Sequence, residues 1–235
     1  MFYGIDYYYI VLVLPAIIIS FYAQIKVNST FSKYSKVQNR RGLTGAEVAR
    51  RILDMNGLSN VVIEHVKGNL SDHYDPKSRV LRLSDSVFSS MSVAALGVAA
   101  HECGHAIQHA KGYSPLKIRH AIYPLVSISS TAAVPLIIMG FIFNTSYLVN
   151  IGIILFAAVV LFQLVTLPVE FNASKRALAI LEESGFLSGS TLSDTDELKS
   201  ARKVLSAAAL TYVASALVAV MQLLRLLIIA NNRRD

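Results

Sequence analysis

A chain of 235 residues with 54% hydrophobic residues and a mean hydropathy of +0.50 is more apolar than an ordinary soluble domain. Its net charge of +7 would suit a nucleic acid or an anionic membrane surface, but the absence of tryptophan and of basic-aromatic interleaving disfavours nucleic acid. The single cysteine excludes an intrachain disulfide. These properties predict an integral membrane protein that contacts lipid and binds no nucleic acid.

The first hydrophobic run, residues 7–25, contains no charged residue and is long enough to cross about 30 Å of hydrocarbon. We predict a transmembrane helix here. No basic segment precedes it and no small-residue cleavage site follows it closely, so we do not interpret it as a removed signal peptide. The next segment, 26–41, is polar, basic and serine-rich, and we expect a connector that lies along lipid headgroups.

A small region of mixed secondary structure is expected next. Thr44 and Glu47 are spaced as a capping box, which predicts a helix that ends near Met55. Residues 61–66 and 79–83 have the composition of short strands separated by a turn-rich segment. Because neither face of 79–83 is fully apolar, we expect an edge strand to which an extended peptide can add, with a plain hairpin as the alternative.

The sequence His-Glu-Cys-Gly-His at 101–105 follows a small, apolar segment, and together they predict a buried helix that ends near Gly112. Histidines four residues apart share one helix face and can hold one Zn²⁺ ion, while Glu102 can serve as general base toward a zinc-activated water. Cys103 points to another side of the helix and is expected to pack. The alternative is a surface helix that carries this pattern by chance.

The second half of the chain contains three further hydrophobic runs. Residues 121–143 and 148–167 predict a transmembrane hairpin. A polar segment follows, with a loop expected at 188–194. The last run, 207–230, is interrupted only by Arg225, and it either crosses the membrane or lies at the interface.

Charge predicts the orientation of these segments. Of the 22 Lys and Arg residues, fourteen lie between the first and second hydrophobic runs and five between the third and fourth. The N-terminal segment and the hairpin turn contain none. Since cytoplasmic loops carry the excess of basic residues, both rich segments are expected in the cytoplasm.

The predicted fold class is a mainly α integral membrane protein, with about four transmembrane or membrane-embedded helices and a small α+β zincin-like cytoplasmic domain that carries the HExxH helix. We expect it in a bacterial cell membrane with the active site facing the cytoplasm. The expected parts are a first transmembrane helix (1–25), a cytoplasmic metalloprotease part (26–120), a transmembrane hairpin (121–167), a cytoplasmic segment with the third ligand (168–206), a fourth hydrophobic helix (207–230) and a polar tail (231–235).

A catalytic zinc site needs a third protein ligand. His109 lies about 12 Å along a straight helix from His101, too far to share the ion. The metzincin pattern also fails, because Gln108 and Lys111 stand where it requires Gly and His. Glu170, which follows a membrane crossing, is the better candidate. The fallback ligands are Glu182, Glu183 and Glu197.

The segment Ala99–Gln108, followed much later by Glu170-Phe-Asn-Ala-Ser174, resembles the YugP family of membrane neutral zinc metallopeptidases and, more distantly, the HtpX and CAAX prenyl endopeptidase group. This resemblance implies a membrane-embedded gluzincin in which two His and one Glu bind zinc. In the resembling group the third ligand opens an E-x-x-x-D motif. Here the last position is Ser174, so the role of that residue next to the metal ligands is open.

We therefore predict a zinc metalloendopeptidase, with one Zn²⁺ per chain, that cleaves peptides or membrane proteins at the cytoplasmic membrane face. Its metal ligands would be His101, His105 and Glu170. The alternative function is a catalytically inactive zinc-binding membrane scaffold that binds partner proteins, and zinc transport has less support. Ser174 is also a candidate support for the ligands, and the other candidate supports or oxyanion donors are Asn172, His65, His73, His120 and Arg176.

Overall fold

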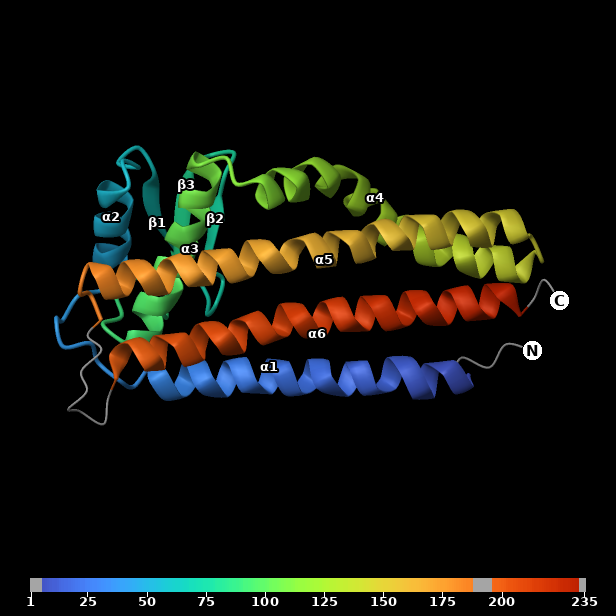
Figure 1. Cartoon of the computed structure of the whole chain (residues 1–235), viewed down its shortest axis with the longest axis horizontal. Coiled ribbons are helices and arrows are strands. Elements are labelled where there is room, and N and C mark those ends of the chain that lie inside the picture. Colours follow the sequence, from blue (N-terminus) through green and yellow to red (C-terminus); the bar gives the residue numbers. More distant parts are fainter. Residues whose placement is uncertain (1–5, 188–195, 233–235) are drawn as a thin grey trace. The chain divides into compact units, whose positions relative to one another are not determined.

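The computed structural model describes residues 6–187 and 196–232 and is mainly helical, with one small sheet (Figure 1). The chain forms two compact units. The helical unit comprises Met1–Gln24, Pro115–Pro168 and Leu210–Asp235, and the mixed unit comprises Ile25–Ser114 and Val169–Ala209. The loop expected at 188–194 and the last residues of the polar tail lie outside the described residues.

The mixed unit contains helix α2 (Gly45–Met55), which begins with the predicted capping box. The Thr44 side chain accepts from the Glu47 N–H, and the Glu47 carboxylate accepts from the Thr44 N–H at 2.8 Å. Its sheet has the order β1-β3-β2, from strands β1 (Val62–Val66), β2 (His73–Asp75) and β3 (Val80–Ser84). β1 runs parallel to β3, and β2 runs antiparallel to it.

The expectation that 79–83 forms an edge strand is wrong, because β3 is the central strand. A hairpin of 61–66 with 79–83 is wrong as well, because β1 runs parallel to β3; the antiparallel partner of β3 is β2. Leu81 and Leu83 are fully buried. Arg82 is tolerated between two neighbours because both supply carboxylates: Glu64 on β1 at 3.0 Å and Asp75 on β2 at 3.6 Å. A peptide that extends this sheet therefore has to pair with β1 or β2.

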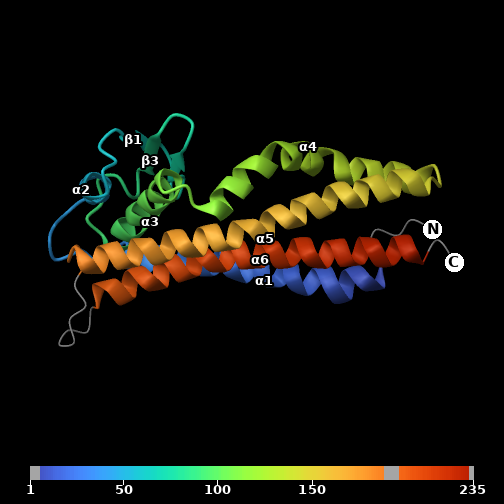
Figure 2. The same cartoon turned by 45° about the horizontal axis from the view of Figure 1, so that its top comes forward.

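Helix α3 (Val93–Ala110) carries the His-Glu-x-x-His sequence and packs against α2 (Figure 2). The Ser92 hydroxyl caps its N-terminus by accepting from the Ala95 N–H at 3.1 Å. Its C-terminus is closed by Gly112 at φ +62°, after which the Tyr113 N–H donates to the Gln108 carbonyl. These local signals place the helix as the sequence predicts.

Each of the four long apolar helices among the described residues extends beyond the hydrophobic run predicted within it. Helix α1 (Leu14–Tyr34) follows a π-helical turn (Tyr9–Val13) and continues through part of the expected polar connector, because Phe31 and Tyr34 are buried in the core of the mixed unit. Helix α5 (Ser146–Glu183) is continuous through Pro168. Helices α4 (Ser114–Ile142) and α6 (Glu197–Asn231) complete the four helices that are long and apolar enough to cross a membrane, among the described residues.

Contacts inside the helical unit bring three chain segments to one end of it. Arg225 near the end of α6 forms an ion pair with Asp6 at 2.6 Å and lies over the Tyr9 ring, at the start of the first helix. Ala230 lines a small pocket together with Asn144 of the α4–α5 turn. The C-terminal end of α6 therefore lies beside the N-terminal end of the first helix, so α6 crosses the membrane if the first helix does.

This arrangement predicts that Asn144→Cys and Asn231→Cys react from the same side of the membrane with an impermeant thiol reagent. Lys67→Cys, which the second hydrophobic run separates from Asn144, should react only from the other side. Background labelling should be low because the native Cys103 is fully buried and burial raises the pKa of its thiol. Labelling of Asn231→Cys together with Lys67→Cys would show that α6 does not cross.

Candidate metal centre

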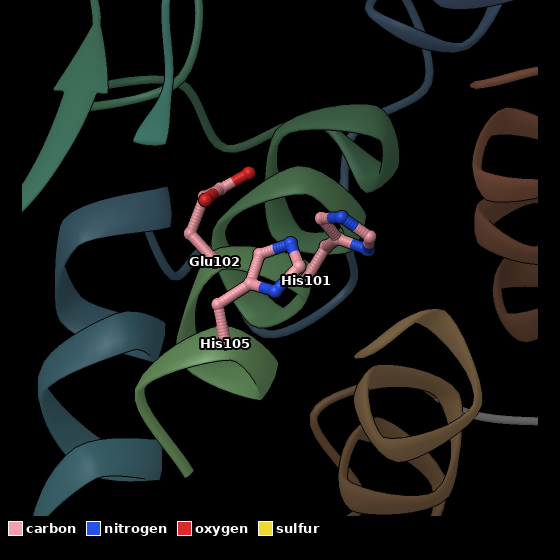
Figure 3. A group of neighbouring side chains, drawn as sticks. All are labelled: His101, Glu102 and His105. Carbon is pink, nitrogen blue, oxygen red and sulfur yellow. The ribbon is translucent and has the colours of Figure 1, made fainter. Parts of the chain in front are cut away.

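His101 and His105 lie on one face of α3, with their imidazole rings side by side (Figure 3). The ring centroids are 4.8 Å apart, and the ring planes are nearly perpendicular at 87°. Their side chains are 12% and 13% exposed, so the pair is largely enclosed but still reachable from outside. Two imidazoles one helical turn apart can offer two nitrogen ligands to one ion.

The Glu170 carboxylate from α5 lies near the same atom, Nε2, of both imidazole rings. Its Oε2 atom lies 3.3 Å from His101 Nε2 and 3.5 Å from His105 Nε2, and the side chain is 3% exposed. Ligand atoms about 2.0–2.1 Å from a tetrahedral zinc ion are about 3.4 Å from one another. The two distances from Glu170 Oε2 therefore fit a shared Zn²⁺ ion, which would leave a fourth position for another ligand.

Glu102 supplies a second carboxylate beside the imidazole pair. One of its oxygens lies within 4.8 Å of a nitrogen of each histidine, and Figure 3 shows the side chain beside the imidazole pair. The Glu170 carboxylate lies 3.3 and 3.5 Å from the two Nε2 atoms. Burial raises the pKa of the Glu102 carboxyl, and the neighbouring charges of His105 and His101 oppose this shift. A carboxylate with a raised pKa is a stronger base than a solvated one.

The electrostatics of His105 show the influence of Glu170. Burial lowers the pKa of the His105 imidazole, but the hydrogen bond to Glu170, aided by the nearby carboxylate charges, raises it by more. The Glu170 carboxylate therefore stabilises the protonated form of the His105 imidazole. Zinc competes with that proton, since imidazole binds a metal only through a free nitrogen lone pair.

Close packing of α3 against α5 brings Glu170 to the histidines. A Cβ atom added at Gly104 would lie 2.8 Å from the Ala173 carbonyl oxygen, closer than real Cβ atoms approach a backbone oxygen. Glycine at this position thus lets the backbones of the two helices approach. Ala173 lies one turn after Glu170 on α5, so the same contact fixes where Glu170 lies along the axis of α3.

Three of the other sequence-predicted residues, Ser174, Asn172 and Arg176, lie next to the ligand candidates or their neighbours. The Ser174 hydroxyl is 3.1 Å from His101 Nδ1. Asn172 Oδ1 accepts from Arg176 Nε at 2.8 Å and from Gln108 Nε2 at 3.0 Å. The histidines proposed as donors lie elsewhere: His65 bonds to Asp85, His73 bonds to the Ser71 carbonyl, and His120 is on α4 in the helical unit.

Gln108 is a site residue that the sequence reasoning missed. Its Oε1 atom lies 3.1 Å from His105 Nδ1, and the side chain is fully buried. The available signal was its spacing, because a residue three positions after His105 lies on the same helix face.

His109, which is too far from His101 to share a metal ion, hydrogen-bonds to the Tyr74 hydroxyl at 3.0 Å. Glu197, one of the fallback ligands, accepts from the Arg40 N–H at 2.8 Å.

Comparisons with known proteins agree with this chemistry. The family model described as "Putative neutral zinc metallopeptidase" matches residues 9–231. The chain belongs to this family. It is also 51% identical over 227 residues to the "Putative membrane protease YugP" of Bacillus subtilis (strain 168), covering 97% of this chain and 98% of that protein. The expected resemblance to the YugP family is thus confirmed, whereas the similarity to the HtpX group is not shown. No solved structure matches the chain.

Substitution of Gly104 tests whether its close approach to Ala173 positions Glu170. We expect Gly104→Ala to weaken zinc binding by about tenfold or more, because the new methyl group pushes Ala173, and with it Glu170, away from the histidines. Gly97→Ala is the matched control on the same helix: its added Cβ would lie 3.5 Å from Ala201 Cβ, an ordinary contact. Metal analysis of the purified variants measures both. Equal zinc content in the two variants would contradict the packing argument.

Proposed function

We propose that this protein is a gluzincin-like zinc endopeptidase embedded in a membrane, with one Zn²⁺ ion per chain held by His101, His105 and Glu170. The observation that carries this proposal is the position of Glu170 Oε2, 3.3 and 3.5 Å from the two Nε2 atoms. Membership of a family described as a zinc metallopeptidase supports the choice of metal and of reaction class.

Bound zinc would polarise the scissile carbonyl and lower the pKa of a water molecule at the open position. Glu102 accepts the proton of the attacking water and returns it to the nitrogen of the leaving amine. Its burial and raised pKa suit it to hold that proton between the two steps. Ser174 and Gln108 hold the Nδ1 sides of the two imidazoles, so that both Nε2 atoms face Glu170.

The site would face the cytoplasm close to the bilayer. This orientation is supported by the nineteen basic residues that flank the hydrophobic runs on one predicted side, fourteen in one segment and five in the other. Glu170 follows the hydrophobic run 148–167 by three residues, about 4.5 Å along continuous α5. Substrates would then be loops or tails of membrane proteins, or cytosolic peptides at the membrane surface.

The alternative of an inactive zinc-binding scaffold drew its support from Ser174, which replaces an aspartate of the resembling group. The Ser174 hydroxyl lies within hydrogen-bonding distance of His101 Nδ1, so a partner for that imidazole is retained. Glu102 is also in place beside the imidazole pair. Both observations favour the enzyme over the scaffold.

The role of Glu102 is tested by Glu102→Gln, which removes the base while keeping the shape of the side chain. We expect this variant to retain one zinc per chain and to lose cleavage of fluorescent casein by about 10²–10⁴-fold. Glu182→Gln, an exposed residue of α5, is the control and should leave cleavage unchanged. A Glu102→Gln variant that cleaves at the wild-type rate would remove Glu102 as the base, and an inert wild type would favour the scaffold.

The third ligand is tested by Glu170→Ala. We expect zinc content, measured by mass spectrometry of the metal in detergent-purified protein, to fall from about one per chain to a small fraction of that, because two imidazoles alone leave the ion under-coordinated. Glu183→Ala removes an exposed carboxylate of the same helix and should keep its zinc. Full zinc content in Glu170→Ala would mean that the third ligand is another residue.

A further inference from the structure

We propose that Gln108 is the positioning residue that fixes the tautomer of His105, and that Asn172, held by Arg176, fixes Gln108 in turn. This inference rests on the metal-binding half of the proposed function and does not depend on proteolysis. It concerns a chain of four side chains that links α3 to α5 behind the imidazole. Each of its hydrogen bonds has only one workable direction.

A backbone carbonyl sets the orientation of the Gln108 amide group. The Gln108 amide group places Nε2 at 2.8 Å from the Val169 carbonyl oxygen and at 3.0 Å from Asn172 Oδ1. A carbonyl oxygen can only accept a hydrogen bond, so the amide nitrogen rather than the amide oxygen has to face it. The reversed amide would set two oxygens against each other in a fully buried position.

The orientation of Asn172 follows in the same way. Its Oδ1 atom also lies 2.8 Å from Arg176 Nε, which can only donate. Two donors therefore converge on this oxygen, one from Arg176 and one from Gln108. The guanidinium group keeps the Asn172 oxygen turned toward Gln108.

With both amide hydrogens of Gln108 engaged, its Oε1 atom is left facing His105 Nδ1 at 3.1 Å. An amide oxygen accepts, so Nδ1 has to carry the proton. In a neutral imidazole the other nitrogen then bears the lone pair, and that nitrogen is Nε2, which faces Glu170. The network thus presents His105 in the tautomer that binds a metal through Nε2.

His101 is held differently. Its Nδ1 atom lies beside the Ser174 hydroxyl, which can donate or accept by rotating. Ser174 therefore tolerates either tautomer of His101, whereas Gln108 selects one tautomer of His105. The two histidines should respond unequally when their partners are removed.

The decisive measurement is the zinc dissociation constant, obtained by competition with a chelator of known affinity. We expect Gln108→Met, which keeps the length of the side chain and removes its hydrogen bonds, to bind zinc about 10–100-fold more weakly. The same substitution at the exposed Gln38 is the matched control and should change nothing. Wild-type affinity in Gln108→Met would overturn the proposal, whereas a wild type that binds no zinc would instead overturn the proposed metal site.

A second pair of variants separates positioning from packing. Asn172→Asp keeps an oxygen that accepts from Gln108 and Arg176, so its zinc affinity should stay within about threefold of wild type, while Asn172→Leu should weaken binding by about tenfold. Because Asn172 acts through Gln108, Gln108→Met combined with Asn172→Leu should bind no more weakly than Gln108→Met alone. Full additivity, or equal losses in Asn172→Asp and Asn172→Leu, would refute the network.

Thermal unfolding of the zinc-free proteins completes the test. A positioning role predicts that Asn172→Asp and Asn172→Leu differ in zinc affinity by more than their metal-free stabilities differ, when both are converted to the same free-energy scale. If the loss of zinc affinity in Asn172→Leu equals its loss of metal-free stability, the residue is structural and the proposal is wrong. This comparison remains available if Gln108→Met does not fold.

Discussion

The geometry of the candidate metal centre depends on one steric constraint, the close approach of α3 and α5 at Gly104 and Ala173. The two histidines come from a single helix and are arranged by its periodicity alone. Glu170 comes from a helix distant in sequence, and only backbone contact at a residue without a side chain brings its carboxylate within 3.5 Å of both imidazoles. The absence of a side chain at position 104 thus allows the backbone approach that places Glu170 beside both imidazoles.

Local signals made much of this structure predictable from sequence. The capping box at Thr44 and the C-terminal Gly112 act within a few residues, and the structure places the start of α2 and the end of α3 where those signals indicate. The four apolar helices were likewise predictable from composition. Their full lengths were not, because α1 is extended to Tyr34 by side chains that find partners only in the folded core.

Long-range pairing was the part that sequence could not supply. Arg82 made 79–83 look like an edge strand, yet it lies in the central strand because Glu64 and Asp75 on its two neighbours neutralise it. From the sequence, Gln108 was only a position at which the metzincin pattern fails. Its role could not be predicted, because its partners Val169 and Asn172 lie more than sixty positions away. In both cases the role of a polar residue depends on partners that only the fold brings near.

The Nδ1 atoms of His101 and His105 both have uncharged partners, and this affects the proposed chemistry. A Zn²⁺ ion held by two neutral imidazoles and one carboxylate would keep a net charge of +1, which would polarise a substrate carbonyl. Ser174 and Gln108 support the imidazoles without adding negative charge. A carboxylate at either position would bind its imidazole more strongly but would also reduce the positive potential at the open position. The serine at position 174 is therefore compatible with catalysis, because a hydrogen bond, rather than a charge, is what orients the imidazole.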